Sequence, residues 1–139
     1  MALETYNLAD IFEALTDALP HKIAAVYGSE RLTYAELDAR ANQLAQHWAA
    51  AGVGEGDHVG LLLYNCMEFL EGMLAALKLR AVPVNVNYRY VAPELAYLFD
   101  NADMVGLVYE GELEGEVAAA LKTRPVQHLL RVRGEGASA

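Results

Sequence analysis

The residues best suited to chemistry in this sequence lie at the end of an extended segment, at positions 82–90. Valine and asparagine alternate there, so Asn85 and Asn87 fall on one face of a strand, and Tyr88 and Arg89 follow at its tip. Loop tips at strand ends often carry function, and the Arg89 guanidinium could pair with a carboxylate or phosphate on another part of a larger protein. The same stretch is equally typical of a sheet edge that closes in a hydrogen-bonded turn. On the first interpretation Asn85, Asn87, Tyr88 and Arg89 are interdomain or substrate-side contacts.

Cysteine and histidine give no catalytic or metal-binding pattern. The single cysteine, Cys66, falls in the first turn of an expected helix, where the helix dipole would lower the pKa of a thiol. No His and acidic residue at a suitable spacing accompanies it, so we expect a small buried residue rather than a nucleophile. The four histidines lack the i, i+4 spacing and the companion cysteines of a metal site. The scattered histidines are His21, His47, His58 and His128.

Two further motifs have structural interpretations. The glycine-rich run 52–56 closes a helix and leads into a strand, whereas a dinucleotide-binding loop must follow a strand and open a helix. We therefore expect a connecting turn, with Gly52 ending the helix in a left-handed conformation and Val53 packing back on Trp48. Asn65 and Glu68 have the spacing of a capping box at the next helix start, and that role explains the pair without a ligand.

The elements that would position these residues alternate along the chain. Apolar spacing predicts a helix over 7–19 with Asn7 as N-cap, then a small hairpin around residues 28–30. A capping box at Thr33 and Glu36 opens a second helix. The apolar run at 58–64 has no polar alternation, as expected of a strand covered on both faces. The remaining segments are expected to be helical at 65–80, 93–100 and 112–122, and extended at 82–86, 104–109 and 127–132. This order predicts a three-layer α/β fold with a largely parallel sheet between helices.

Composition limits the partners. The net charge of −9 repels nucleic acid and anionic lipid, and the longest apolar runs are far shorter than the roughly 20 residues of a membrane-spanning helix. One cysteine cannot form an internal disulfide, and residues 1–5 show no secretion leader, which favours the cytoplasm. At 139 residues we expect one domain over 1–133, with a disordered tail at 134–139.

Five blocks of sequence resemble the opening of acyl-CoA synthetases, which belong to the adenylate-forming, AMP-binding enzymes. The resemblance covers about Asn7 to Val132, and two positions depart from the family's pattern: Met67 stands where proline is frequent, and Arg80 where glycine is frequent. The blocks that carry the resemblance are 32–45, 52–59, 65–69, 77–87 and 94–103.

The resemblance implies a two-step reaction. A carboxylic acid attacks ATP to give an acyl-adenylate and pyrophosphate, and the thiol of coenzyme A then displaces AMP. It implies ATP, magnesium and coenzyme A for a full-length enzyme, but the family's phosphate loop and catalytic lysine are absent from residues 1–139. No catalytic, cofactor-binding or metal-binding residue is therefore carried over to this chain. We expect an inactive N-terminal scaffold whose partner is the missing C-terminal part, and which dimerises when isolated through apolar surface left uncovered. The alternative is a freestanding α/β binding or interaction module.

Overall fold

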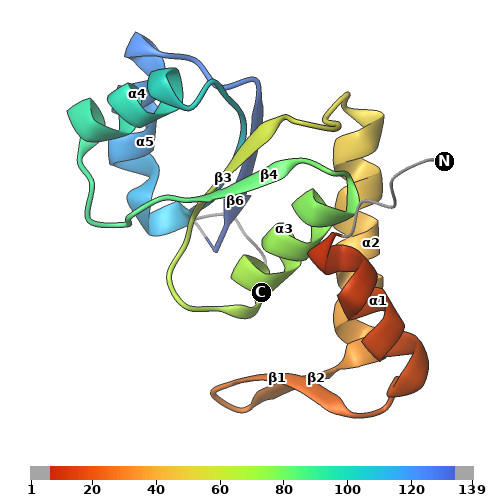
Figure 1. The fold of residues 1–139 in the computed structure, drawn as a ribbon. Coiled ribbons are helices and arrows are strands. Elements are labelled where there is room, and N and C mark those ends of the chain that lie inside the picture. The colour runs from red at the N-terminus through yellow and green to blue at the C-terminus, as the bar shows by residue number, and fades with distance from the viewer. Residues whose placement is uncertain (1–6, 134–139) are drawn as a thin grey trace, which may run out of the picture.

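A four-stranded parallel sheet forms the centre of the structure, a computed structural model that describes residues 7–133 (Figure 1). The strand order is β4-β3-β5-β6, and all three pairings are parallel, as the sequence predicts. The middle strand β3 is buried on both faces, because Val59, Leu61 and Leu62 leave it no polar side. The strands, in chain order, are β3 (His58–Leu62), β4 (Val82–Asn85), β5 (Met104–Glu110) and β6 (His128–Val132).

Helices cover both faces of this sheet and confirm the predicted three layers (Figure 1). The helices α2 (Tyr34–Ala50) and α3 (Met67–Lys78) enclose one apolar cluster with the sheet, around Trp48, Val59 and Leu61. The helices α4 (Ala92–Asn101) and α5 (Glu114–Thr123) enclose the other, around Phe99 and Leu107, and the short 3₁₀ helix η1 (Gly111–Leu113) precedes α5. The expected tail at 134–139 lies outside the described residues.

The ends of α2 follow the sequence prediction closely. Thr33 Oγ1 accepts from the Glu36 N–H, and Glu36 Oε1 accepts from the Thr33 N–H, each at 3.1 Å. Beyond the helix, Gly52 has φ +99°, and the Val53 N–H donates to the Trp48 carbonyl at 3.0 Å. The capping box and the glycine stop are therefore both confirmed.

The first helix, α1 (Leu8–Ala18), forms where predicted but buries a different face from the one its pattern suggests. Asn7 caps it, with Oδ1 accepting from the Ala9 N–H at 2.8 Å. Ala9 and Thr16 are buried and Phe12 packs against the core, whereas the other apolar residues of the predicted stripe are exposed, and Leu8 is 64 % accessible. The hairpin that follows, β1 (Ile23–Tyr27) and β2 (Glu30–Thr33), is antiparallel as predicted and projects from the body beside α1 (Figure 1). The exposed apolar residues of this region are Leu8, Ile11, Leu15, Leu19, Ile23, Val26 and Tyr27.

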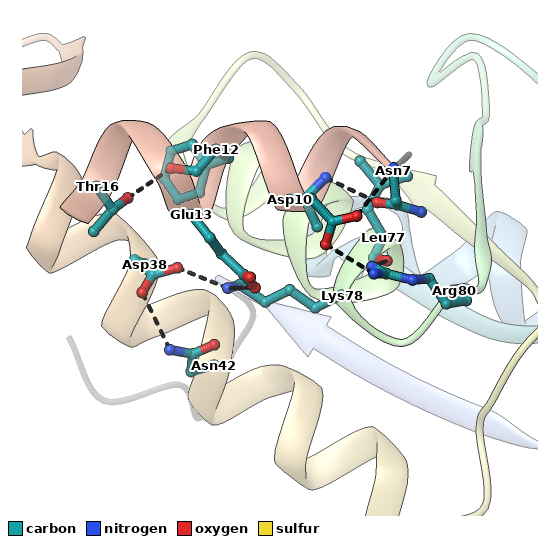
Figure 2. A network of polar contacts seen from close by, with 11 residues as sticks. Asn7, Asp10, Phe12, Glu13, Thr16, Asp38, Asn42, Leu77, Lys78 and Arg80 are labelled. Carbon is teal, nitrogen blue, oxygen red and sulfur yellow. Dashed lines mark hydrogen bonds and ion pairs between the residues drawn. The ribbon is translucent and has the colours of Figure 1, made fainter. Parts of the chain in front are cut away.

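Ion pairs fasten α1 to the rest of the domain (Figure 2). Lys78, the last residue of α3, lies between Glu13 of α1 at 2.8 Å and Asp38 of α2 at 2.7 Å. Arg80 adds a contact to Asp10 at 2.8 Å. Burial opposes the Lys78 charge, but the hydrogen bonds to Asp38 and Glu13 outweigh it and raise the Lys78 pKa. The side of α1 that packs on the domain thus combines these ion pairs with the packing of Ala9 and Phe12, while the other apolar residues of the stripe are exposed.

The connections create a switch point in the sheet. From β3 the chain passes to β4 on one side and then returns to β5 on the other. Ligands of open α/β sheets gather in the crevice at the carboxyl ends of strands around such a point. The segments that leave β3, β4 and β5 after Leu62, Asn85 and Glu110 are therefore the first place to look for a site.

Candidate functional site

A polar cleft of about 410 Å³ lies at the carboxyl ends of β3 and β4. Segments from three parts of the chain form its walls: the loop after β3 with the start of α3, the loop after β4, and α4. The side chains that line it are Leu63, Asn65, Phe69, Asn85, Val86, Asn87, Tyr88, Tyr90 and Leu98. Three of the four residues singled out from the sequence therefore meet here, and the fourth, Arg89, lies in the same loop.

The loop after β4 is a turn built on Asn87. The Asn87 side-chain oxygen accepts from the Arg89 N–H at 2.9 Å, and its carbonyl accepts from the Tyr90 N–H at 3.1 Å. The sheet edge and the hydrogen-bonded turn are thus both present, since β4 is an outer strand of the sheet. The expected alternation holds for Val84 and Val86, which contact the α4 and α5 layer, but Val82 is exposed.

Arg89 is exposed at the tip of this loop. Its guanidinium lies 5.7 Å from the centre of the Tyr88 ring, within the range of a cation–π contact. Within residues 7–133 it forms no ion pair, so its charge is available to a group outside the described structure.

Tyr64, which was not predicted as a site residue, connects the loop after β3 to the loop after β4. Its ring meets the Tyr88 ring edge to face, with centroids 5.1 Å apart, and its hydroxyl donates to Glu112 at 3.4 Å. Burial and the neighbouring carboxylates of Glu112 and Glu110 raise the Tyr64 pKa, so the phenol stays protonated as a donor. Its place at the end of the apolar run 58–64 is the only signal in the sequence that could have marked it.

The predicted capping box of Asn65 and Glu68 is wrong. The N-cap of α3 is Cys66, and no side chain bonds to the free N–H groups there. Glu68 instead pairs with Arg133 at 2.6 Å, which draws its carboxylate away from the helix start. Burial opposes the charge of Glu68, but the Arg133 guanidinium outweighs it and lowers the Glu68 pKa. Asn65 is left to line the cleft.

Cys66 is buried, as predicted. Burial raises the pKa of its thiol, although Arg133 acts in the opposite direction. A raised pKa keeps the thiol protonated at neutral pH, and the thiolate is the reactive form. Cys66 is therefore a packing residue beneath the start of α3.

The glycine-rich run is a connecting turn, as expected. The Gly54 N–H donates to the Asp57 carboxylate at 2.9 Å, and the Gly56 N–H donates to the Arg80 carbonyl at 2.9 Å. These donors are occupied within the domain, and the run precedes β3 rather than following it.

The residues at the cleft do not fit a magnesium–triphosphate site. Across residues 7–133, no three His, Cys, Asp or Glu side chains are grouped so that they could hold a metal ion. Magnesium favours carboxylates and waters, whereas the polar side chains lining the cleft are amides and phenols.

No helix within residues 7–133 combines the length and hydropathy that a bilayer-spanning segment needs.

Comparison with known proteins identifies the chain's relatives. The family model described as AMP-binding enzyme matches residues 12–138. A medium/long-chain-fatty-acid–CoA/3-oxocholest-4-en-26-oate–CoA ligase of Mycobacterium marinum is 48 % identical over 119 residues, covering 86 % of this chain and 22 % of that protein. A 3-oxocholest-4-en-26-oate–CoA ligase of Rhodococcus rhodochrous is 42 % identical over 130 residues, covering 94 % of this chain and 23 % of its own length.

Solved structures agree with the sequence matches. The structure titled Mycobacterium tuberculosis fatty acyl CoA synthetase superposes with a TM-score of 0.84 at 28 % identity, covering 91 % of this chain and 26 % of that one. The chain thus spans about a quarter or less of these relatives, and the matched segment is their N-terminal part. Family match, curated relatives and fold together establish that the chain belongs to the AMP-binding enzyme family.

Proposed function

We propose that this chain is the N-terminal scaffold of an acid–CoA ligase that activates a fatty acid with ATP and transfers it to coenzyme A. The observation that carries the proposal is the 42–48 % identity, over 86–94 % of the chain, to ligases named for fatty-acid and 3-oxocholestenoate substrates. In that enzyme ATP, with magnesium, would activate the acid as an adenylate. Coenzyme A would supply the thiol that accepts the acyl group. The chain itself would supply no catalytic group.

The cleft at the ends of β3 and β4 is the part of the scaffold that we propose meets the rest of the enzyme or its substrates. Asn85, Asn87 and Tyr88 line it, and Arg89 presents beside it a cation that has no ion-pair partner among residues 7–133. A guanidinium at an exposed loop tip suits a planar carboxylate or phosphate, to which it can donate two parallel hydrogen bonds. This charge is the main support for a contact with a later segment.

A chimera tests the proposal directly. The N-terminal segment of the Mycobacterium marinum ligase is replaced by residues 7–133 of this chain, and acyl-CoA formation is followed with a long-chain fatty acid and with 3-oxocholest-4-en-26-oate. We expect activity with the fatty acid at no less than roughly a tenth of the parent's rate, since interactions along 48 % identical sequence are largely retained. A folded chimera without activity would contradict the proposal and favour the freestanding binding module.

We propose the cytoplasm as the location and two partners for the chain. The free, buried Cys66 suits a reducing compartment. In the full-length enzyme the partner is the C-terminal remainder. In isolation we expect a homodimer, because the exposed stripe along α1 and the hairpin offers apolar surface that a second copy can cover about a two-fold axis.

Light scattering after size exclusion tests the dimer. At micromolar concentration we expect a mass near twice the 15.1 kDa of one chain. Ile11→Lys places a charge in the middle of the stripe and should return the mass to that of a monomer. Tyr97→Lys, at an even more exposed position on α4, should not. A monomer at all concentrations, or a dimer that survives Ile11→Lys, would contradict this assembly.

A further inference from the structure

Glu110, the last residue of β5, is a buried carboxylate that none of the roles described above uses. It is only 2 % accessible. Acidic residues are almost never buried to this degree unless they are paired and hydrogen-bonded, because moving an ionised carboxylate out of water is costly. Its partners come from two separate segments of the chain, the residue after β6 and the loop between β3 and α3.

The first partner is Arg133, one residue beyond β6. Its Nε donates to Glu110 Oε2 at 3.2 Å and its Nη2 donates to Glu110 Oε1, which is the two-pronged geometry that only arginine offers. Its third nitrogen, Nη1, reaches Glu68 of α3 at 2.6 Å. Burial opposes the Arg133 charge, but the hydrogen bonds to Glu110 and Glu68 outweigh it and raise its pKa, so the cation persists.

The second set of partners belongs to the loop between β3 and α3. The Tyr64 N–H donates to Glu110 Oε1 at 3.3 Å, and the Cys66 thiol lies 3.9 Å from the same oxygen. This loop has no strand partner, and α3 begins without a side-chain cap. Glu110 is therefore the acceptor that fixes the loop to the sheet.

We propose that Glu110 is the positioning residue of the cleft: its carboxylate, held by Arg133, fixes Tyr64, and the Tyr64 ring in turn sets the place of Tyr88 beside Asn87 and Arg89. Tyr64 is the link because its backbone bonds to Glu110 while its ring contacts Tyr88 at 5.1 Å. The end of β5 thereby controls a loop that leaves β4, two strands away in the sheet. This proposal rests on the proposed function only in treating the cleft as the surface that contacts the rest of the enzyme or its substrates.

Amide exchange at Tyr64 tests the arrangement in the intact chain. In the unmodified protein, the Tyr64 N–H should exchange at least tenfold more slowly than its sequence alone dictates, although it lies outside any strand or helix. Glu110→Gln keeps the size but removes the charge, and should speed this exchange roughly tenfold, since hydrogen bonds to charged groups are about twice as strong as neutral ones. The contact between the Tyr64 and Tyr88 rings, measured by nuclear Overhauser effects, should weaken with it.

Asp100→Asn is the matched control, because it removes one carboxylate from a surface pair with Arg124 on the opposite layer. It should leave Tyr64 exchange unchanged. Arg133→Lys keeps the charge but loses the two parallel hydrogen bonds to Glu110. It should speed amide exchange at Tyr64 without affecting exchange at Leu61 in β3. This variant tests the same link if Glu110→Gln does not fold. Equal acceleration at Tyr64 and Leu61 would reveal a purely structural role and overturn the proposal, as would an unprotected Tyr64 in the unmodified chain. Neither result depends on catalysis, so neither would bear on the ligase proposal.

Discussion

Replacing Lys78 by methionine should detach α1 from the domain. The Lys78 side chain is 7 % accessible, and its ammonium joins Glu13 of α1 to Asp38 of α2. Methionine keeps most of the aliphatic volume and removes the charge. Breaking a fully buried ion pair costs about 3–5 kcal/mol, but water reaches Asp38 and Glu13, so we expect a loss of about 2 kcal/mol.

Thermal melting followed by far-UV circular dichroism measures this loss. For a chain of 139 residues, roughly 4 °C of Tm corresponds to 1 kcal/mol, so Lys78→Met should melt about 8 °C earlier. Arg80→Gln is the control, since it removes a neighbouring pair to Asp10 in which both side chains are about 40 % exposed. Such a surface pair contributes about 0.5 kcal/mol, which predicts a drop of about 2 °C that high salt abolishes.

An equal fall in Tm in the two variants would refute this reasoning, because it would mean that burial of Lys78 does not strengthen its ion pairs. A higher Tm for Lys78→Met would refute it as well. Limited proteolysis gives an independent check: cleavage within α1 should become faster in Lys78→Met than in Arg80→Gln at a temperature where both domains are folded.

Three other predictions concern single positions. Arg80 has φ +60°, so Arg80→Gly should relieve about 1 kcal/mol of backbone strain. This gain exceeds the contribution of the weak ion pair to Asp10 that is lost, so the urea midpoint should rise; a lower midpoint would contradict the prediction. Burial and the hydrogen bond to Glu114 raise the pKa of Tyr109 to about 12, and the unfolded chain releases this proton first, near pH 10. Stability should therefore fall between about pH 10 and 12, by on the order of 1 kcal/mol at pH 11, and Tyr109→Phe should remove that part of the fall; an identical fall in both proteins would count against it. Arg89→Ala in the chimera should lower kcat/KM by about tenfold, from the loss of one charged hydrogen bond, whereas Arg31→Ala on the exposed hairpin should not; equal kinetics would return Arg89 to a solvent-exposed role.

The layers of the fold could be predicted because their signals are local. The uninterrupted apolar run of β3 and the capping box at Thr33 each depend on residues close together in sequence. Arg80 is instructive in the same way: it stands where the family often has glycine, and its positive φ shows why glycine suits that position.

What escaped prediction depends on distant residues. The capping box at Asn65 and Glu68 fails because Arg133, far along the chain, pairs with Glu68. The stripe of α1 has the spacing of a buried face, yet of its residues only Phe12 packs on the core, and the helix docks through Ala9, Phe12 and the ion pairs of Lys78 and Arg80. Glu110 gave no signal at all, since one carboxylate at the end of an apolar strand has no periodicity to detect.

The same distinction explains the outcome for the cleft. Asn85, Asn87, Tyr88 and Arg89 are neighbours in sequence, so their common position at the end of β4 and in the loop after it could be predicted. Tyr64 could not, because its role requires β3 and β4 to be adjacent in the sheet.

Pyrophosphate release by the purified 139-residue chain tests the central claim, that this part of the enzyme positions but does not catalyse. The chain is incubated with ATP, magnesium, a long-chain fatty acid and coenzyme A, and the active chimera serves as the positive control. We predict release no faster than in buffer, because the described residues at the cleft offer no metal site, and the single guanidinium of Arg89 beside it cannot surround a triphosphate. Release that rises in proportion to the concentration of the isolated chain would contradict the account.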